Sequence, residues 1–193
     1  MIYSTQQVDE QATKSGILSA IEEIYDNADY DDIIFISMAS HGWPNGFSAY
    51  DQGIGAYDIS KRLDSDKTTF INIDCCHSGS FIDDLQSDNR IILTSCRANE
   101  TSGQGNEGWG ASPHISFFVE AISGRYLRIS FGRGDPIPND EDADYNDDGN
   151  VTVEEAYKYI YTNNFLSQTP QLSDGYPELS NNQEDLILTQ PNK

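Results

Sequence analysis

The chain has 193 residues, enough for a substantial hydrophobic core, and we expect a single domain over 1–193. It carries 32 Asp and Glu residues against 11 Lys and Arg residues, a formal net charge of −21. A surface this acidic repels nucleic acid and anionic membranes, and no apolar run is long enough to span a bilayer. We therefore expect no nucleic-acid or membrane partner; the charge suits a basic substrate, bound cations or simple solubility.

The first two thirds of the chain alternate between helical and strand patterns. The predicted elements are a helix over 11–28, strands over 33–39, 68–76 and 90–96, a short helix over 56–64, and a helix over 112–123 that stops at Gly124. Residues 41–46, HGWPNG, predict a loop after the first strand. This alternation indicates an α/β fold with a mostly parallel sheet and helices on both faces. In such sheets, ligands bind beyond the carboxyl ends of the strands.

The last third has a different composition. Residues 132–150 are acidic and interrupted by Pro and Gly, and a helical pattern resumes over 151–165. The polar tail contains one short apolar run, Leu186–Leu188, which predicts an edge strand.

Histidine and cysteine residues follow two neighbouring strands of the predicted sheet. His41 comes directly after the first strand, and Cys75 and Cys76 end the second. Neighbouring strands are about 5 Å apart, so side chains at equivalent ends come within reach of each other. An imidazole beside a thiol lowers its pKa or takes its proton, which yields a thiolate nucleophile. The main-chain N–H groups of Gly42 and of the nucleophile would hold a developing oxyanion.

The alternation of side chains along a strand distinguishes the two cysteines. Cys75 continues an apolar face with Ile71 and Ile73, whereas Cys76 shares the other face with Asp74. Cys76 is therefore the better candidate nucleophile, and Asp74 is placed to bind a basic side chain of a substrate. Two alternatives stay open at this point: ordinary packing, and a metal site that uses four residues, His41, Cys75, His77 and Cys96. Their spacing is unlike that of known zinc sites.

These motifs carry a resemblance. ASHG at 39–42 and DCCHSGSF at 74–81 resemble the caspase–haemoglobinase superfamily of cysteine peptidases, metacaspases most closely, and LTSCRANETSGQG at 93–105 resembles legumain-like peptidases. The resemblance implies that His41 is the catalytic histidine, Cys76 the nucleophile and Gly42 the oxyanion-hole glycine. It also implies that Asp74 is the acidic residue that gives metacaspases a preference for Arg or Lys before the cleaved bond.

The chain departs from this family in two respects. Family members begin with a further central strand before the helix that starts here near Ala12, and we expect no such strand in this sequence. The separation of 35 residues between His41 and Cys76 is also short. The main hypothesis is a cysteine endopeptidase; the alternative is a catalytically inactive calcium-binding or interaction module on the same fold.

Residues 144–155, DYNDDGNVTVEE, match the twelve-residue EF-hand calcium loop D-x-[DN]-x-[DN]-G-x₅-E. The predicted ligands of Ca²⁺ are Asp144, Asn146, Asp148, the main-chain carbonyl of Asn150, and Glu155. The loop resembles the single loops of dockerins, and a solvated acidic loop is the alternative. We expect a structural calcium by default and a regulatory one as the sharper hypothesis. Localisation stays open, because calcium favours the outside of the cell and no secretory signal is visible in the sequence.

Overall fold

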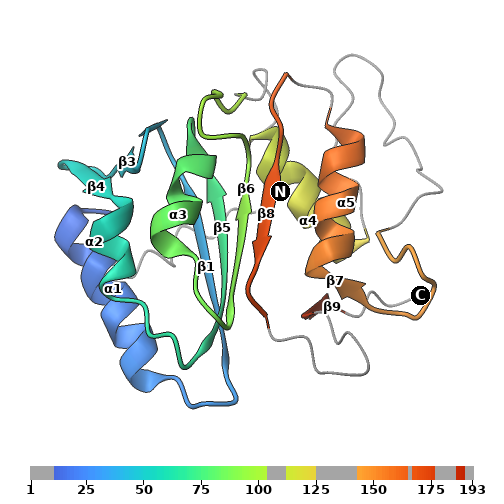
Figure 1. Cartoon of the computed structure of the whole chain (residues 1–193), viewed down its shortest axis with the longest axis horizontal. Coiled ribbons are helices and arrows are strands. Elements are labelled where there is room, and N and C mark those ends of the chain that lie inside the picture. The colour runs from blue at the N-terminus through green and yellow to red at the C-terminus, as the bar shows by residue number, and fades with distance from the viewer. Residues whose placement is uncertain (1–10, 104–111, 125–142, 165–166, 177–185, 190–193) are drawn as a thin grey trace, which may run out of the picture.

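The computed structural model describes residues 11–103, 112–124, 143–164, 167–176 and 186–189. A four-stranded sheet forms its centre, in the order β1-β5-β6-β8. β1 (Ile33–Ala39), β5 (Thr68–Asp74) and β6 (Arg90–Thr94) are parallel, and β8 (Gln171–Asp174) runs antiparallel to β6. The α/β fold with a mostly parallel sheet, predicted from the sequence, is confirmed (Figure 1).

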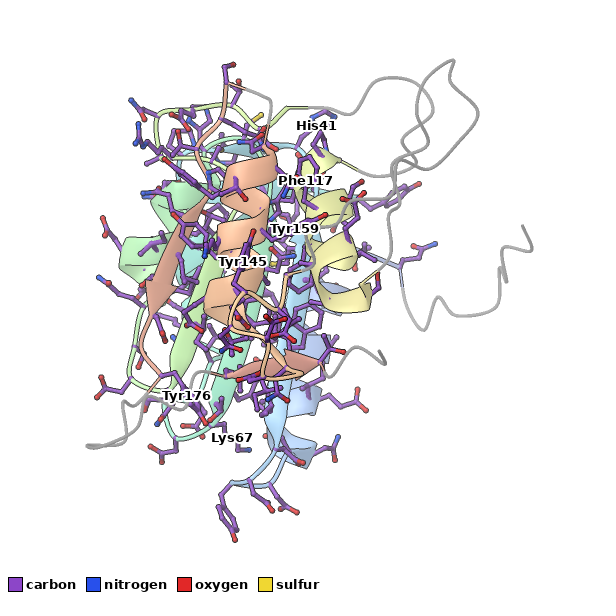
Figure 2. The ribbon with its side chains drawn as sticks, turned by 90° about the vertical axis from the view of Figure 1, so that its right-hand side faces the viewer. His41, Lys67, Phe117, Tyr145, Tyr159 and Tyr176 are labelled. Atoms are coloured by element: carbon purple, nitrogen blue, oxygen red, sulfur yellow. The ribbon has the colours of Figure 1, made fainter. Side chains whose placement is uncertain are left out.

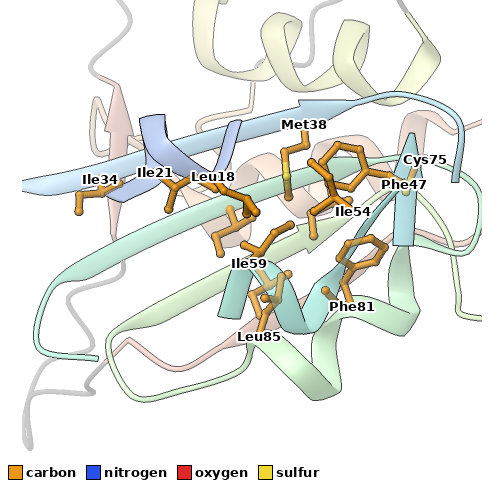
Figure 3. Close-up of a cluster of buried hydrophobic side chains, with 14 of the residues drawn as sticks. Leu18, Ile21, Ile34, Met38, Phe47, Ile54, Ile59, Cys75, Phe81 and Leu85 are labelled. Carbon is orange, nitrogen blue, oxygen red and sulfur yellow. The ribbon is translucent and has the colours of Figure 1, made fainter. Parts of the chain in front are cut away.

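Helices cover both faces of this sheet. On one face lie α1 (Lys14–Asn27), α2 (Ala56–Ser60) and α3 (Ile82–Leu85), and on the other lie α4 (Pro113–Ser123) and α5 (Val153–Asn163) (Figure 1). Each face has its own hydrophobic core. The first core contains Leu18 and Ile21 of α1 (Figure 3) together with the β5 residues Ile71 and Ile73, and the second joins Phe70 to α4 and α5. The odd and even residues of β5 thus enter different cores, as the period of a strand requires.

The inner strands β5 and β6 are more buried than β1, which lies at one edge of the sheet. All residues of β6, and all of β5 except Thr68, are buried, because these strands have neighbours on both sides and helices above and below. The burial of β1 alternates, with Ile33 and Phe35 at least half exposed. No other strand of the described residues pairs with its outer edge. The bounds of β1 agree with the prediction, and the strand is only partly buried because it lies at an edge of the sheet.

Two further predictions need correction, and a third is confirmed with a shift of one residue. The expected loop at 41–46 contains β2 (Gly42–Trp43) and the start of β3 (Gly46–Ser48), which pairs in turn with β4 (Gly53–Gly55). The predicted strand over 68–76 ends at Asp74, so both cysteines lie beyond it. The apolar tail forms β9 (Ile187–Thr189), which pairs with β7 (Val151–Thr152) in a separate small sheet.

The helix ends have local causes in the sequence. α4 begins with Ser112 as its N-cap and Pro113 in its first turn, and it stops at Gly124, which is left-handed with φ 59°. α5 begins with a capping box between Thr152 and Glu155. No helix of the described residues is long and apolar enough to cross a membrane.

Candidate active site

The register of the sheet brings the two predicted catalytic segments together. Ala39 pairs with Asp74 across β1 and β5, and the main-chain N–H of Ser40 donates to the Asp74 carbonyl at 3.1 Å. His41 and Cys76 follow these positions by two residues each, so both lie at the carboxyl edge of the sheet. His41 is exposed there, at the end of the molecule opposite Lys67 (Figure 2).

Gly42 lies directly against the main chain of the two cysteines. A Cβ atom at this position would lie 2.4 Å from the Cys76 carbonyl oxygen and 2.7 Å from Cys75 Sγ. Both distances are far below van der Waals contact, so only glycine fits without a shift of the backbone. The predicted oxyanion-hole glycine is therefore in contact with the segment that carries the predicted nucleophile.

A tight turn after β5 presents Cys76. His77 is left-handed with φ 62°, an uncommon conformation for a residue with a side chain, and the 3₁₀ helix Ser78–Phe81 follows. The His77 main-chain N–H donates to the Glu100 carbonyl at 2.8 Å, and its Nδ1 lies 2.8 Å from the Ala98 carbonyl oxygen. The sequence showed His77 only as a possible metal ligand; the structure gives it a place in the turn that follows Cys76.

Gly79, within this turn, lies against the segment that follows β6. A Cβ atom there would lie 2.8 Å from the Ala98 main-chain nitrogen and 2.9 Å from the Cys96 carbonyl oxygen.

The two adjacent cysteines have different surroundings. Cys75 is 3% exposed and packs in the first core with Ile71 and Ile73, as strand alternation predicted. Burial, with smaller contributions from neighbouring acidic groups, raises the pKa of the Cys75 thiol to about 12. Cys76 is partly exposed, and its Sγ lies 3.9 Å from the Ser102 carbonyl oxygen. Only Cys76 of this pair is therefore a suitable thiol for chemistry.

Asp74 is buried, at 4% exposure, and both of its carboxylate oxygens have serine partners. The Ser102 hydroxyl donates to Oδ1 at 2.7 Å, and the Ser112 hydroxyl donates to Oδ2. A carboxylate has about four acceptor positions, so capacity for a further donor remains. Neither serine was expected from the sequence, because both reach Asp74 from segments far along the chain.

A second polar pair lies beneath Asp74, on the side of α4. His114 is 1% exposed and its Nε2 lies 2.7 Å from Oδ1 of Asn72, which is fully buried. Burial lowers the pKa of His114 to about 4, although the negative charge of Asp74 acts in the opposite direction. His114 is therefore neutral at pH 7.

The segment 97–103 forms one wall of the site and is tied to the residues that precede β8. The two Glu100 carboxylate oxygens accept hydrogen bonds from the Thr169 main-chain N–H at 2.7 Å and hydroxyl at 3.1 Å. The Gln168 side chain, on a residue that is 6% exposed, accepts a hydrogen bond from the Gly103 main-chain N–H. These contacts hold the segment that contains Ser102 against the C-terminal part of the chain.

The predicted calcium loop lies at the N-terminal end of α5, away from the strand ends that carry His41 and Cys76 (Figure 1). Gly149 has φ 89°, as the sharp turn of such a loop requires. The polar side chains of the loop accept hydrogen bonds from its main-chain N–H groups. Asp144 accepts from Asp148 and Gly149, Asn146 from Asp148, Asp148 from Asn150, and Glu155 from Tyr145 and Thr152. The oxygen donors suit calcium chemically.

In the part of the chain that the structure describes, no group of three or more His, Cys, Asp or Glu side chains is arranged to hold a metal ion. The calcium site thus stays a prediction from the sequence of the loop.

Comparison with known proteins agrees with this geometry. The model of the peptidase C13 family matches residues 3–129. Among solved structures, caspase-1 from Spodoptera frugiperda superimposes with a TM-score of 0.62 at 12% identity, covering 94% of this chain and 73% of that one. A structural-genomics target protein from Geobacter sulfurreducens gives 0.60 at 13% identity, covering 94% and 80%. No curated protein matches by sequence.

The structural likenesses, at such low identity, establish the fold. The family match extends over well over half of the 193 residues and includes His41, Gly42, Asp74 and Cys76. The chain therefore belongs to the peptidase C13 family, with a function of the cysteine-peptidase type.

Proposed function

We propose that the protein is a cysteine endopeptidase in which Cys76 is the nucleophile and His41 the general base and acid. The position of Gly42 carries this proposal, because the absence of a side chain there lets the segment after His41 lie directly against the Cys76 main chain. The Cys76 thiolate would attack the substrate carbonyl carbon after proton transfer to His41. The new C–S bond gives a tetrahedral oxyanion, which the main-chain N–H groups of Gly42 and Cys76 would stabilise.

The remaining steps complete the hydrolysis. The C–N bond breaks as His41 returns its proton to the leaving amine, which leaves an acyl group on Cys76. A water molecule, deprotonated by His41, then attacks this thioester and releases the carboxylic acid, and the thiol is restored. Neutral Cys75 has no part in these steps, because its raised pKa keeps it protonated.

Asp74 gives the proposed enzyme a preference for a basic residue before the cleaved bond. Its carboxylate is buried beside the Cys76 segment and accepts hydrogen bonds from two serine hydroxyls. A guanidinium or ammonium group that reaches this carboxylate would gain a charge-assisted hydrogen bond in a site of low exposure. The net charge of −21 also attracts basic peptides.

A covalent probe tests the catalytic assignment. A peptidyl electrophile with Arg at the position before the reactive carbon should label the wild type and Cys75→Ala, and fail to label Cys76→Ala and His41→Ala. Matching probes with Asn, Asp or Leu in place of Arg should react at least about tenfold more slowly. Labelling that persists in Cys76→Ala would refute the nucleophile, and equal reaction of all four probes would refute the role of Asp74.

The alternative function is an inactive calcium-binding or interaction module on the same fold. The presence of His41, Gly42, Asp74 and Cys76 in one family match favours the enzyme. Failure of folded, calcium-saturated protein both to bind the covalent probe and to cleave basic peptides would favour the module.

We further propose that Ca²⁺ binds the loop 144–155 through the five predicted residues: Asp144, Asn146, Asp148, Asn150 and Glu155. The left-handed Gly149 and the oxygen donors of the loop support this proposal. Calorimetry should show calcium binding in the wild type and in Asp147→Asn, and its loss in Glu155→Gln. Both variants remove one negative charge from the same loop, so equal binding by both would refute Glu155 as a ligand.

A further inference from the structure

Trp43 is an exposed aromatic residue with a fixed position beside the site. Its side chain is 41% exposed, although tryptophan is usually well buried. The ring lies against two glycines of the neighbouring strands. A Cβ atom at Gly46 would lie 2.5 Å from Trp43 Nε1, and one at Gly53 would lie 2.7 Å from two ring carbons. The two glycines therefore leave room for one side of the Trp43 ring, and other parts of the ring are exposed to solvent.

The residues around Trp43 are hydrogen-bonded to, and packed against, the turn that follows Cys76. The Asn45 main-chain N–H donates to the Ser80 hydroxyl at 2.7 Å. Phe47, on β3, contacts Phe81 in the first core with a ring-centroid distance of 6.2 Å. The strands that hold Trp43 and the turn that presents Cys76 are thus joined by a hydrogen bond and a ring contact.

The strands that hold Trp43 pack over the first core, whereas Asp74 is tied to the other face of the sheet. Phe47, which pairs with Gly42, and Ile54, which pairs with Phe47, belong to the first core. The Asp74 carboxylate accepts a hydrogen bond from Ser112, the N-cap of α4, which covers the other face. A peptide bound with its basic side chain at Asp74 therefore continues, past the cleaved bond, towards the His41–Trp43 segment. The same direction follows from chemistry, because the leaving amine takes its proton from His41.

We propose that Trp43 binds the side chain of the first residue after the cleaved bond and selects for an aromatic or large aliphatic residue there. This inference rests on the proposed peptidase function. A flat indole face gains free energy by stacking with an aromatic ring or by covering apolar surface, and it gives little to glycine or to an acidic side chain. Because the ring is already fixed, little conformational entropy is lost when a substrate binds.

The experiment uses internally quenched peptides that share Arg before the cleaved bond and differ only in the next residue: Phe, Leu, Gly, Asp or Lys. The concentration of competent enzyme is first measured with the Arg-directed covalent probe, which has no residue beyond the reactive carbon. The wild type should cleave the Phe and Leu peptides with kcat/KM about tenfold above the Gly and Asp peptides. Trp43→Ala should reduce the ratio to about twofold or less, and Trp43→Phe should retain most of it.

Two controls separate the possible outcomes. Tyr57→Ala removes a side chain that is 60% exposed on α2, and it should leave the ratio unchanged. If Trp43→Ala does not fold, the comparison passes to Trp43→Met, which fills similar space without an aromatic face. A wild-type enzyme that reacts with the probe but shows no preference, or prefers Lys, overturns this inference and leaves the peptidase intact. Absence of the probe reaction instead refutes the proposed function itself.

Discussion

The side chain of Ser112 joins Asp74 to the first turn of α4. Its hydroxyl donates to Asp74 Oδ2 and also accepts the Ile115 main-chain N–H at 3.3 Å, so one group caps the helix and holds the buried carboxylate. The helix end and the proposed substrate pocket therefore share a single hydroxyl.

Replacement of this serine should affect stability and substrate binding together. Ser112→Ala removes the cap and one donor to Asp74, so we expect a loss of about 1–2 kcal/mol in the free energy of unfolding and a higher KM for Arg peptides. Thr13→Ala is the matched control, because Thr13 caps α1 at 3.1 Å from the Gly16 nitrogen and has no link to Asp74. It should lower stability alone; an equal rise in KM in both variants would contradict the shared role.

Gly42 should not tolerate any side chain. Gly42→Ala places a methyl group within 2.4 Å of the Cys76 carbonyl oxygen, which must displace the proposed nucleophile or the oxyanion donor. We expect the reaction with the Arg-directed probe to fall by about 10²-fold or more. Gly55→Ala is the control, since its nearest contacts lie at 3.7 Å and the change should cost less than about 1 kcal/mol. Normal labelling of a folded Gly42→Ala protein would exclude the close approach as a functional requirement.

Glu100 should make the wall of the site sensitive to acid. Partial burial acts to raise its pKa, but hydrogen bonds from Arg97 and Thr169 outweigh this and hold the pKa below the ordinary value of 4.5. A carboxylate with a lowered pKa stabilises the fold above its ordinary pKa, and this contribution is lost as the pH falls through the lower folded value. Thermal unfolding should therefore show Glu100→Gln less stable than the wild type at pH 7, with the difference shrinking below about pH 4.5. A difference in stability that stays constant down to pH 3 would show that the ionisation of Glu100 does not stabilise the fold.

His114 should produce a second loss of stability on acidification, which begins at a higher pH than the loss caused by Glu100. Its folded pKa is lowered from 6.5 to about 4, so the unfolded chain takes up a proton first as the pH falls. The stability of the neutral, buried imidazole is present above pH 6.5 and decreases down to about pH 4, by about 3 kcal/mol in all. His114→Gln keeps a donor for Asn72 and should flatten the stability profile in this window. An unchanged slope would assign the loss to other groups.

The sequence predicted most of the central fold because its signals are local. The bounds of β1, the stop of α4 at Gly124 and the separation of Cys75 from Cys76 depend on periodicity and on single residues. The hairpin around Trp43 was taken for a loop, since its strands are only two and three residues long and have no apolar pattern. β8 was missed because QLSD is polar and becomes a strand only by pairing with β6.

The chemical residues of the candidate site show the same division. His41 and Gly42 follow one predicted strand, and Asp74 and Cys76 stand at the end of the next, so strand position alone could group them. Ser102 and Ser112 reach Asp74 over 28 and 38 residues of sequence, and no local pattern marks them. The assignment of roles to these groups, and of calcium to the loop 144–155, stays a prediction.

The order of the strands gives the two members of the proposed dyad unequal mechanical support. Cys76 follows β5, which is hydrogen-bonded on both sides, whereas His41 follows β1, which is bonded to β5 alone among the described strands. The amides of an outer strand exchange with solvent through local opening, while those of a central strand require the sheet to separate. Mild denaturant should therefore displace the histidine before the cysteine, so that peptidase activity fades while the thiol still occupies its native turn.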